Sequence, residues 1–191
     1  MRIRDLCRFT VVLAAGMLTT QGAAAQPYFG LGFASLSLSS DYAPIDGQSG
    51  TGFALIGGYA FAQTWSIELS VSAADIDAGP TVGIYYPADS AEYSILRIAV
   101  RKSLWTLGEH AWTPWLAVGG AYHYVNWSTF YYQLDGTGAS LGAGADFALA
   151  PSWSVRVQAM HNRFSASDTY GDGSYSSKTN ELSASVIYTL R

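Results

Sequence analysis

His161 is the residue whose type and position come closest to supporting catalysis. A histidine can activate a serine nucleophile when the two side chains lie within hydrogen-bond reach, which is about 3 Å. The position two residues on is Arg163, and the next candidate on the same side of a strand is Ser165. Four residues of strand span roughly 13 Å at ~3.3 Å per residue, so a sharp bend would be needed to join the pair. We therefore predict no catalytic residues and no enzyme activity.

Metal and cofactor sites are not predicted either. His110 and His123 have no second histidine or carboxylate at close ligand spacing. Residues 168–173 contain acids and glycines, but they lack the spacing and the closing glutamate of a calcium loop. We expect no cofactor.

Six charged residues of both signs lie on the polar side of segments that alternate polar and apolar residues. They are Glu68, Arg97, Arg101, Asp146, Arg156 and Glu181. If residues 150–152 form a turn, Asp146 and Arg156 lie directly opposite each other across a hairpin. Such a set can neutralise itself, so we expect an interior ion-pair network. The alternative interpretation is an ion path through a polar lumen.

The elements that carry these charges are strands. Residues 61–71 are matched in character by residues 149–159, at an offset of 88. Each copy has a short turn, an aromatic residue and then a strict alternation, as in Ile67-Glu68-Leu69. A period of two indicates a strand with two different faces.

Eight alternating segments of this kind are present, each close to the length of a tilted membrane-spanning strand. They cover residues 28–38, 51–61, 65–74, 93–104, 112–125, 138–149, 153–164 and 179–190. Short and long connections alternate between them, which in an antiparallel meander places all turns at one end and all long loops at the other. In the first segment the apolar side changes after Phe33, which predicts a bulge or an early exit from the membrane.

The N-terminus has the pattern of a secretory signal peptide. Arg2, Arg4 and Arg8 are followed by an apolar run and by the small residues of 23–25, which predicts cleavage after Ala25 and a single domain over residues 26–191. Removing three arginines and one aspartate changes the net charge from −4 to −6, so a nucleic-acid partner is not expected. The only cysteine, Cys7, lies within the predicted leader.

The composition and the alternation favour a β-barrel, and the distribution of side chains decides whether its apolar face meets water or lipid. A soluble barrel would place the apolar side inside and the charges outside. However, the polar side is dominated by small residues, which suit the narrow interior of eight strands, and its charges balance. Aromatic residues also gather at both ends of the strands, as they do at membrane interfaces. The predicted inner aromatic girdle is Phe61, Trp65, Trp105, Trp112 and Trp153, and the outer girdle is Tyr85, Tyr86, Tyr93, Tyr122, Tyr124, Tyr131 and Tyr132. We therefore predict an all-β fold, an eight-stranded antiparallel up-and-down transmembrane β-barrel.

The sequence resembles the small outer-membrane β-barrel proteins, the OmpA/OmpX-type or porin family group. The resemblance rests on the signal peptide, on residues 28–32 and 57–61 before the first Trp-Ser turn, and on residues 142–147. It implies location in the outer membrane, contact with lipid and lipopolysaccharide, insertion by the outer-membrane assembly machinery and a monomer. Some such barrels are lipid A deacylases with a His-x-Ser-Asn pattern, but Arg163 occupies the serine position here. His161 is then interpreted as an interface residue beside lipid headgroups.

The predicted extracellular loops are acidic and rich in tyrosine. Their acids are Asp41, Asp46, Asp75, Asp77, Asp89, Glu92, Asp135, Asp168 and Asp172. An unknown extracellular ligand is one interpretation, and solvated loop tips are the other. The favoured function is a structural or surface-interaction protein with a plugged interior; the alternatives are a lipid A-modifying enzyme and a narrow small-solute pore.

Overall fold

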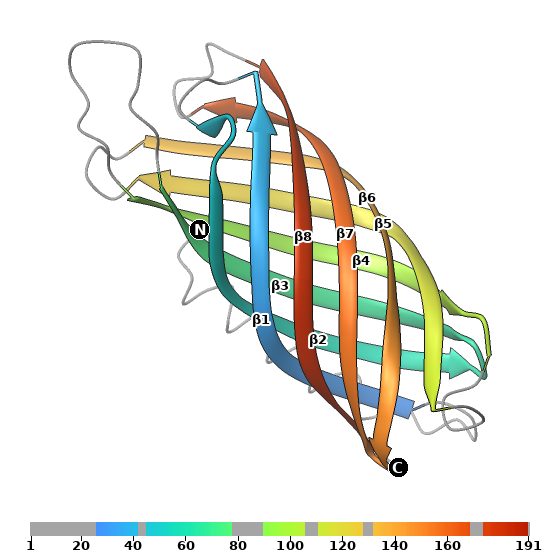
Figure 1. Ribbon diagram of the computed structural model, residues 1–191. Helices are drawn as coiled ribbons and strands as arrows, with labels where there is room; N and C mark the ends of the chain where they lie inside the picture. The colour runs from blue at the N-terminus through green and yellow to red at the C-terminus, as the bar shows by residue number, and fades with distance from the viewer. Residues whose placement is uncertain are drawn as a thin grey trace.

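The computed structural model describes residues 26–41, 45–77, 90–105, 111–127, 132–168 and 174–190. The chain forms eight antiparallel strands, and β1 pairs with both β2 and β8, so that the sheet closes into a barrel (Figure 1). The strands are β1 (Gln26–Ser40), β2 (Ser49–Ala62), β3 (Trp65–Asp77), β4 (Ser90–Ser103), β5 (Trp112–Trp127), β6 (Tyr132–Ala150), β7 (Trp153–Asp168) and β8 (Ser174–Thr189). The predicted fold class is confirmed. Among the described residues, no helix is long and apolar enough to cross a membrane. The predicted leader, residues 1–25, lies outside the described residues.

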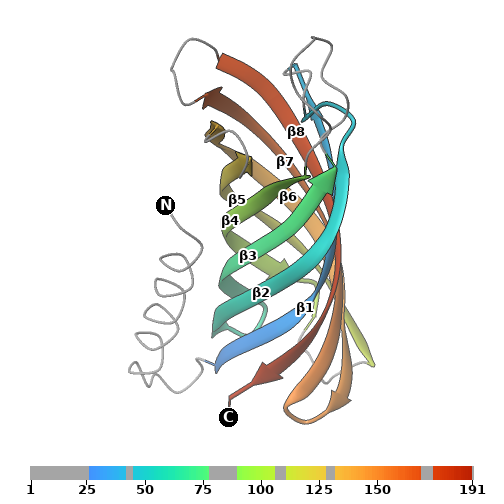
Figure 2. The same cartoon turned by 90° about the vertical axis from the view of Figure 1, so that its left-hand side faces the viewer.

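The two copies of the repeated hairpin segment form equivalent turns at one end of the barrel, here called the turn end. Residues 63–64 connect β2 to β3, and residues 151–152 connect β6 to β7. Both hairpins shift register by one residue just before the turn, at 60/62 and at 148/150. The sequence repeat therefore corresponds to a bulged hairpin that is built twice. The opposite end of the tilted strands is here called the loop end (Figure 2).

The strands extend further toward the loop end than the sequence pattern predicted. The sixth segment was expected over residues 138–149, and β6 runs from Tyr132 to Ala150; the eighth was expected from residue 179, and β8 begins at Ser174. The added residues keep the period of two, but most of their polar members face outward. A prediction that looks for an apolar outer face ends these strands too early.

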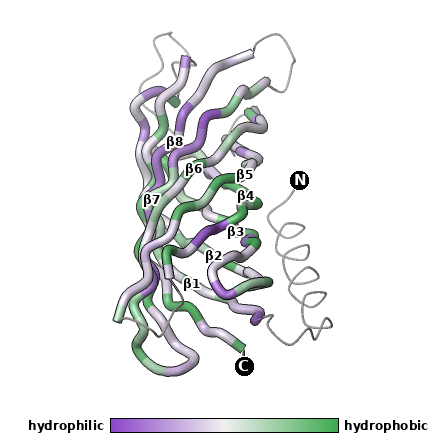
Figure 3. The backbone as a smooth tube through the Cα atoms, turned by 90° about the vertical axis from the view of Figure 1, so that its right-hand side faces the viewer, coloured by the Kyte–Doolittle hydropathy of each residue, from purple (hydrophilic) through white to green (hydrophobic). Residues whose placement is uncertain are grey.

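Toward the turn end, large apolar side chains face outward and charged side chains face inward. Leu116, Leu141 and Leu182 are 58%, 62% and 64% exposed, whereas Arg156 and Glu181 are each 1% exposed. Large aliphatic side chains on the outside of a closed barrel match the hydrocarbon core of a bilayer. The alternation of hydrophobic and hydrophilic positions along the strands is visible in Figure 3.

Toward the loop end, this pattern is reversed. The interior is an apolar cluster that includes Leu36, Leu38, Ile76, Val125 and Leu134, each no more than 3% exposed. The outward positions beside it are polar and exposed: Ser35, Ser37, Ser39, Thr51, Asp75, Asp135, Ser165, Ser167, Ser176 and Lys178. Apolar inside and polar outside is the arrangement of a barrel in water. One closed sheet thus has a half suited to lipid and a half suited to water.

The reversal explains the first strand, in which the apolar side changes after Phe33. The pairing of β1 with β2 and with β8 has continuous register, so β1 contains no bulge. Phe29 and Phe33 face outward in the turn-end half, and Leu36 and Leu38 face inward in the loop-end half. The backbone stays regular, and it is the surroundings of the strand that change.

Candidate functional site in the barrel interior

The lumen near the turn end is organised around one carboxylate, Asp146. Its Oδ1 accepts hydrogen bonds from Arg156 Nε at 2.7 Å and from Trp115 Nε1 at 3.2 Å. Its Oδ2 accepts from Arg156 Nη2 and from Arg101 Nη1, both at 3.0 Å. Four donors on three strands therefore surround a side chain that is 3% exposed.

A second carboxylate, Glu68, completes this group of side chains. The group is here called the turn-end cluster and consists of Tyr28, Glu68, Arg101, Trp115, Asp146 and Arg156. Arg156 Nη1 forms an ion pair with Glu68 Oε2, and the Tyr28 hydroxyl donates to the same oxygen at 2.9 Å. The guanidinium groups of Arg101 and Arg156 lie 5.2–5.4 Å from the ring centroids of Tyr28 and Trp115. At this distance a cation is attracted to the face of an aromatic ring. Two rings and two carboxylates thus hold two cations.

A separate pair, Arg97 and Glu181, crosses the lumen one layer closer to the loop end. Arg97 Nη2 lies 2.8 Å from Glu181 Oε2, and Ser72 Oγ donates to Glu181 Oε1 at 3.0 Å. Arg97 also donates through Nη1 to Ser70 Oγ at 3.2 Å and through Nε to Asn162 Oδ1 at 3.4 Å. The pair joins β4 to β8, which are not neighbours in the sheet.

All six charged residues singled out in the sequence point into the lumen and take part in ion pairs with one another. The expected cross-strand position of Asp146 opposite Arg156 is confirmed by the register of β6 and β7. Sequence reasoning missed Tyr28 and Trp115. Trp115 has the same parity as the inward-facing Ala117 and Gly119, so its inward direction was available from the pattern.

Around the pair of Arg97 and Glu181, several buried polar atoms have no partner among the described residues. They include Ser140 Oγ, Gln158 Oε1, Asn162 Nδ2 and Ser183 Oγ. Buried polar atoms of this kind are normally satisfied by ordered water. This stretch of the lumen is polar enough to hold water, so closure depends on the layers around it.

Those layers continue toward the loop end with an aromatic plug. The Tyr93 hydroxyl is 2.7 Å from His123 Nδ1 and 2.5 Å from Thr179 Oγ1. The His123 ring stacks on Phe164 at a centroid distance of 3.7 Å and an interplanar angle of 6°. Tyr93, predicted to belong to the outer aromatic girdle, is instead fully buried in the lumen. Tyr93 alternates in step with the inward-facing Ile95 and Arg97, so it points to the same side of the strand. The girdle prediction counted aromatic residues near strand ends and did not use this alternation.

Beyond the plug, the interior is mainly apolar, although the buried hydroxyls of Ser40 and Ser177 lie 2.7 Å apart within it. The prediction of a polar interior therefore holds for the turn-end half only, because the loop-end half is surrounded by polar outer residues and must bury its apolar side chains inside.

At the turn end, a cavity of about 380 Å³ opens into the lumen. Its lining includes Tyr28, Arg101, Asp146 and Arg156, so the cavity reaches as far as the turn-end cluster.

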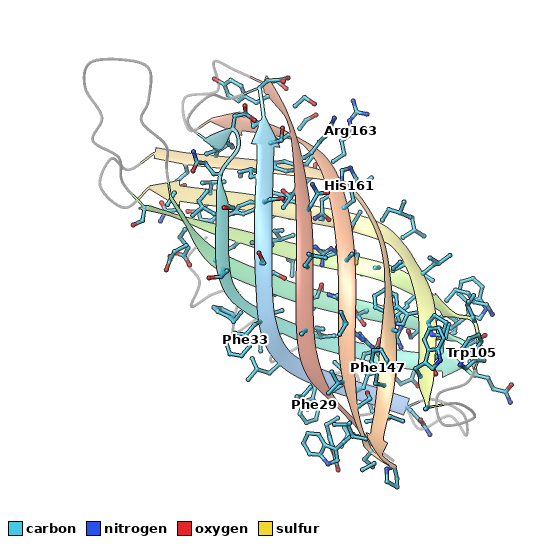
Figure 4. The ribbon with its side chains drawn as sticks, in the orientation of Figure 1. Phe29, Phe33, Trp105, Phe147, His161 and Arg163 are labelled. Carbon is cyan, nitrogen blue, oxygen red and sulfur yellow. The ribbon has the colours of Figure 1, made fainter. Side chains whose placement is uncertain are left out.

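The residues of the predicted inner girdle lie at or beside the turn end. Trp65, Trp112 and Trp153 are 42%, 46% and 47% exposed, and Phe61 is 50% exposed. Trp105 Nε1 donates to the Trp112 carbonyl at 2.7 Å, and the two rings meet edge to face. Figure 4 shows Trp105 and Phe147 toward this end, and Phe29 and Phe33 on the outside of β1.

The loop-end rim carries charge unevenly. On the side of β3 and β4, Asp75 lies opposite Glu92, and partial burial together with the Asp75 carboxylate raises the pKa of the Glu92 carboxyl above its usual range. On the side of β7 and β8, His161, Arg163 and Lys178 face outward and are exposed. Asn180 Oδ1 accepts a hydrogen bond from His161 Nδ1 at 2.8 Å. No group of three or more potential metal ligands occurs among the described residues.

The comparisons with known proteins agree with this architecture. Residues 9–189 match the family model described as the outer membrane protein beta-barrel domain. Comparison with curated proteins gave no significant match. Among solved structures, the chain is similar to the outer membrane protein OprG of Pseudomonas aeruginosa, with a TM-score of 0.65 and 16% identity over 88% of this chain and 97% of that one.

Two further structures are similar at the same level. Neisserial surface protein A gives a TM-score of 0.64 and 15% identity, covering 88% of this chain and 99% of that one. Ail of Yersinia pestis, solved in complex with the heparin analogue sucrose octasulfate, gives a TM-score of 0.58 and 14% identity, covering 87% and 99%. At such identities the likeness establishes the fold alone. The family match covers nearly the whole sequence, and so this chain belongs to the outer membrane protein β-barrel family and is located in the outer membrane.

Proposed function

We propose that this protein is a closed outer-membrane barrel with a structural or surface-interaction role, neither a pore nor a lipid-modifying enzyme. The observation that carries the proposal is the succession of filled layers along the lumen. From the turn end these are the turn-end cluster, the pair of Arg97 and Glu181, the aromatic plug at His123, and the apolar cluster.

Each layer opposes ion passage in a different way. The turn-end cluster fixes its charges through paired hydrogen bonds, and separating a buried ion pair leaves an uncompensated charge. The aliphatic side chains of the apolar cluster offer no polar group to replace the hydration shell of an ion, and hydrophobic constrictions close pores by excluding water. The polar stretch near Gln158 lies between the turn-end cluster and the aromatic plug. Three of the ion pairs, Arg97–Glu181, Arg101–Asp146 and Arg156–Glu68, also join strands that are not adjacent, which supports a role in holding strand register.

The enzyme alternative finds little support in the surroundings of His161. Its ring nitrogen is hydrogen-bonded to Asn180, and the residues paired with it across the neighbouring strands are Leu141 and Asn180. Neither is a nucleophile, and Ser165 lies about 13 Å further along the strand. We infer that His161 is an interface side chain.

The role at the surface rests on the loop-end half. A barrel with a dry core and a polar exterior can stand outside the bilayer and present the acidic rim near Asp75 and Glu92 to the medium. We propose that an extracellular ligand of this rim would be cationic, that residues 1–25 are removed on export, and that the assembly machinery inserts the barrel as a monomer.

Planar-bilayer recordings test the closed lumen. The purified barrel should insert without producing conductance steps in salt solution. Insertion is checked separately, by flotation of the protein with vesicles of the same lipid. Regular, long-lived conductance steps from the unmodified protein would contradict the proposal.

A further inference from the structure

Two cations lie side by side on the outside of the barrel without an anionic partner. Arg163 on β7 and Lys178 on β8 are directly opposite in the strand register, and both face outward and are exposed. Among the described residues, neither takes part in an ion pair. Directly opposed side chains have Cβ atoms about 5 Å apart, and like charges in this position are destabilising. An arrangement of this kind becomes favourable when an anion binds between the two cations.

The neighbouring outward positions contain no carboxylate to serve as this anion. Arg163 pairs with Ala139 on β6, and Lys178 pairs with Ser39 on β1. Among the described residues of these strands, outward acids occur only further toward the loop end: Asp135 pairs with Ser167, and Asp41 bonds through its backbone to Ser176. In the part of the chain that the structure describes, no carboxylate is placed to serve as the anion between Arg163 and Lys178.

The position of the pair relative to the apolar belt indicates where that anion lies. Ala159 and Leu182 are paired four residues closer to the turn end, and Leu182 is 64% exposed. Four residues correspond to about 13 Å along a strand, and less along the barrel axis because the strands are tilted. Between the belt and the two cations, His161 and Asn180 are joined by their hydrogen bond and form a polar step. Figure 4 shows His161 and Arg163 outside the barrel on the loop-end side. Arg163 and Lys178 therefore lie at the depth of the lipid headgroups.

We propose that Arg163 and Lys178, with His161 and Asn180 beneath them, form a binding site for a phosphate of lipid A in the outer leaflet. The proposal rests on the assignment of the protein to the outer membrane, in which barrels direct their loop end outward. Lipid A supplies phosphate groups at headgroup depth and acyl chains that can cover Leu141 and Leu182 below them. Arginine forks hold phosphate oxygens through paired hydrogen bonds, and lysine adds a point charge. The acidic side of the rim, at Asp75 and Glu92, would repel the same group.

The site is tested by measuring the affinity of the folded barrel, in zwitterionic detergent, for bisphosphorylated lipid A and for its dephosphorylated form. The variants are Arg163→Gln, Lys178→Gln and the double variant. Lys102→Gln is the matched control, because Lys102 also lies on the outside of the barrel but near the turn end, 4.7 Å from the Trp65 ring centroid. Folding of every variant is checked by the mobility shift of boiled and unboiled samples on gels.

We expect the unmodified barrel to bind the phosphorylated form more tightly than the dephosphorylated form. A basic residue near an anionic membrane surface contributes about 1 kcal/mol, so each single variant should lose about fivefold in affinity and the double variant about thirtyfold. Lys102→Gln should keep the affinity of the unmodified barrel. The site would be overturned if the double variant kept its full preference for phosphorylated lipid A. It would also be overturned if Lys102→Gln lost as much affinity as the Arg163 and Lys178 variants.

A competition with inorganic phosphate identifies the source of the anion. Millimolar phosphate should displace little lipid A, since the acyl chains add contacts that the free ion lacks. If millimolar phosphate displaced all of the lipid A, the pair of Arg163 and Lys178 would be assigned to a soluble anion, and a lipid site would be contradicted. None of these outcomes depends on conductance, so the lumen proposal and the lipid proposal can fail separately.

Discussion

At the residue scale, Arg156 links the two carboxylates of the turn-end cluster. Its three guanidinium nitrogens contact Asp146 and Glu68, and its side chain is 1% exposed. Removal of one partner from a buried ion pair typically costs about 3–5 kcal/mol, because the remaining charge is left without compensation. The network is therefore sensitive to the loss of this one residue.

We predict that Arg156→Ala lowers the free energy of unfolding by about 3–5 kcal/mol. Arg163→Ala is the control on the same strand, because its exposed side chain forms no ion pair among the described residues, and it should change stability by less than about 0.5 kcal/mol. Urea titration in phosphatidylcholine vesicles, which contain no lipid A, gives both values. Equal stabilities of the two variants would show that the cluster is not needed for stability.

Sequence reasoning identified the six lumen charges from parity alone, since a period of two leaves only two directions for each side chain. It did not identify how they pair. Glu68 and Arg156 lie on strands that are far apart in sequence, and their contact depends on barrel closure, which brings β8 next to β1. The contacts of Tyr28 and Trp115 with the guanidinium groups likewise result from the closed shape of the barrel.

At the element scale, β2 contains a glycine pair whose two members have different surroundings. A Cβ at Gly58 would overlap the ring of Tyr28, which faces Gly58 from β1, whereas a Cβ at Gly57 would meet nothing within 4 Å. Tyr28 has little freedom to move, because its hydroxyl donates to Glu68 at 2.9 Å. Gly58 is thus required by the close approach of a neighbouring ring.

We predict that Gly58→Ala destabilises the barrel by about 1–3 kcal/mol through overpacking. Gly57→Ala places the same methyl group on the outer face and should be neutral within about 0.5 kcal/mol. Vesicle unfolding curves of the two variants provide the comparison. A neutral Gly58→Ala would indicate that the ring of Tyr28 moves aside and that its contacts do not fix the lumen.

The strand ends show where sequence patterns mislead. Number, order and direction of the strands follow from alternation and from the spacing of short and long connections. The loop-end extensions were predicted as loops, since their outward residues are serine and aspartate. Of the two explanations offered for the change of apolar side in β1, the bulge is wrong, because the register is continuous, and an early exit from the membrane is the one that agrees with the regular strand.

At the scale of the whole molecule, the surroundings of the barrel change from lipid to water partway along its length. The turn-end half exposes leucine and buries charge, and the loop-end half exposes serine and buries leucine. Neither half alone distinguishes a membrane barrel from a soluble one. The change from one half to the other along single strands locates the outer edge of the hydrocarbon core of the bilayer at one ring of residues around the barrel.

On β8 this edge falls between Leu182 and Asn180, both of which face outward. Nitroxide labels placed singly at Ala184, Leu182, Asn180 and Ser176 of the vesicle-inserted barrel report the medium outside each position. We predict that collisions with oxygen dominate at 184 and 182, and that collisions with a water-soluble nickel chelate dominate at 180 and 176. Access of the chelate to all four positions, or to none of them, would contradict the central claim that the barrel crosses the membrane with one half and stands in water with the other.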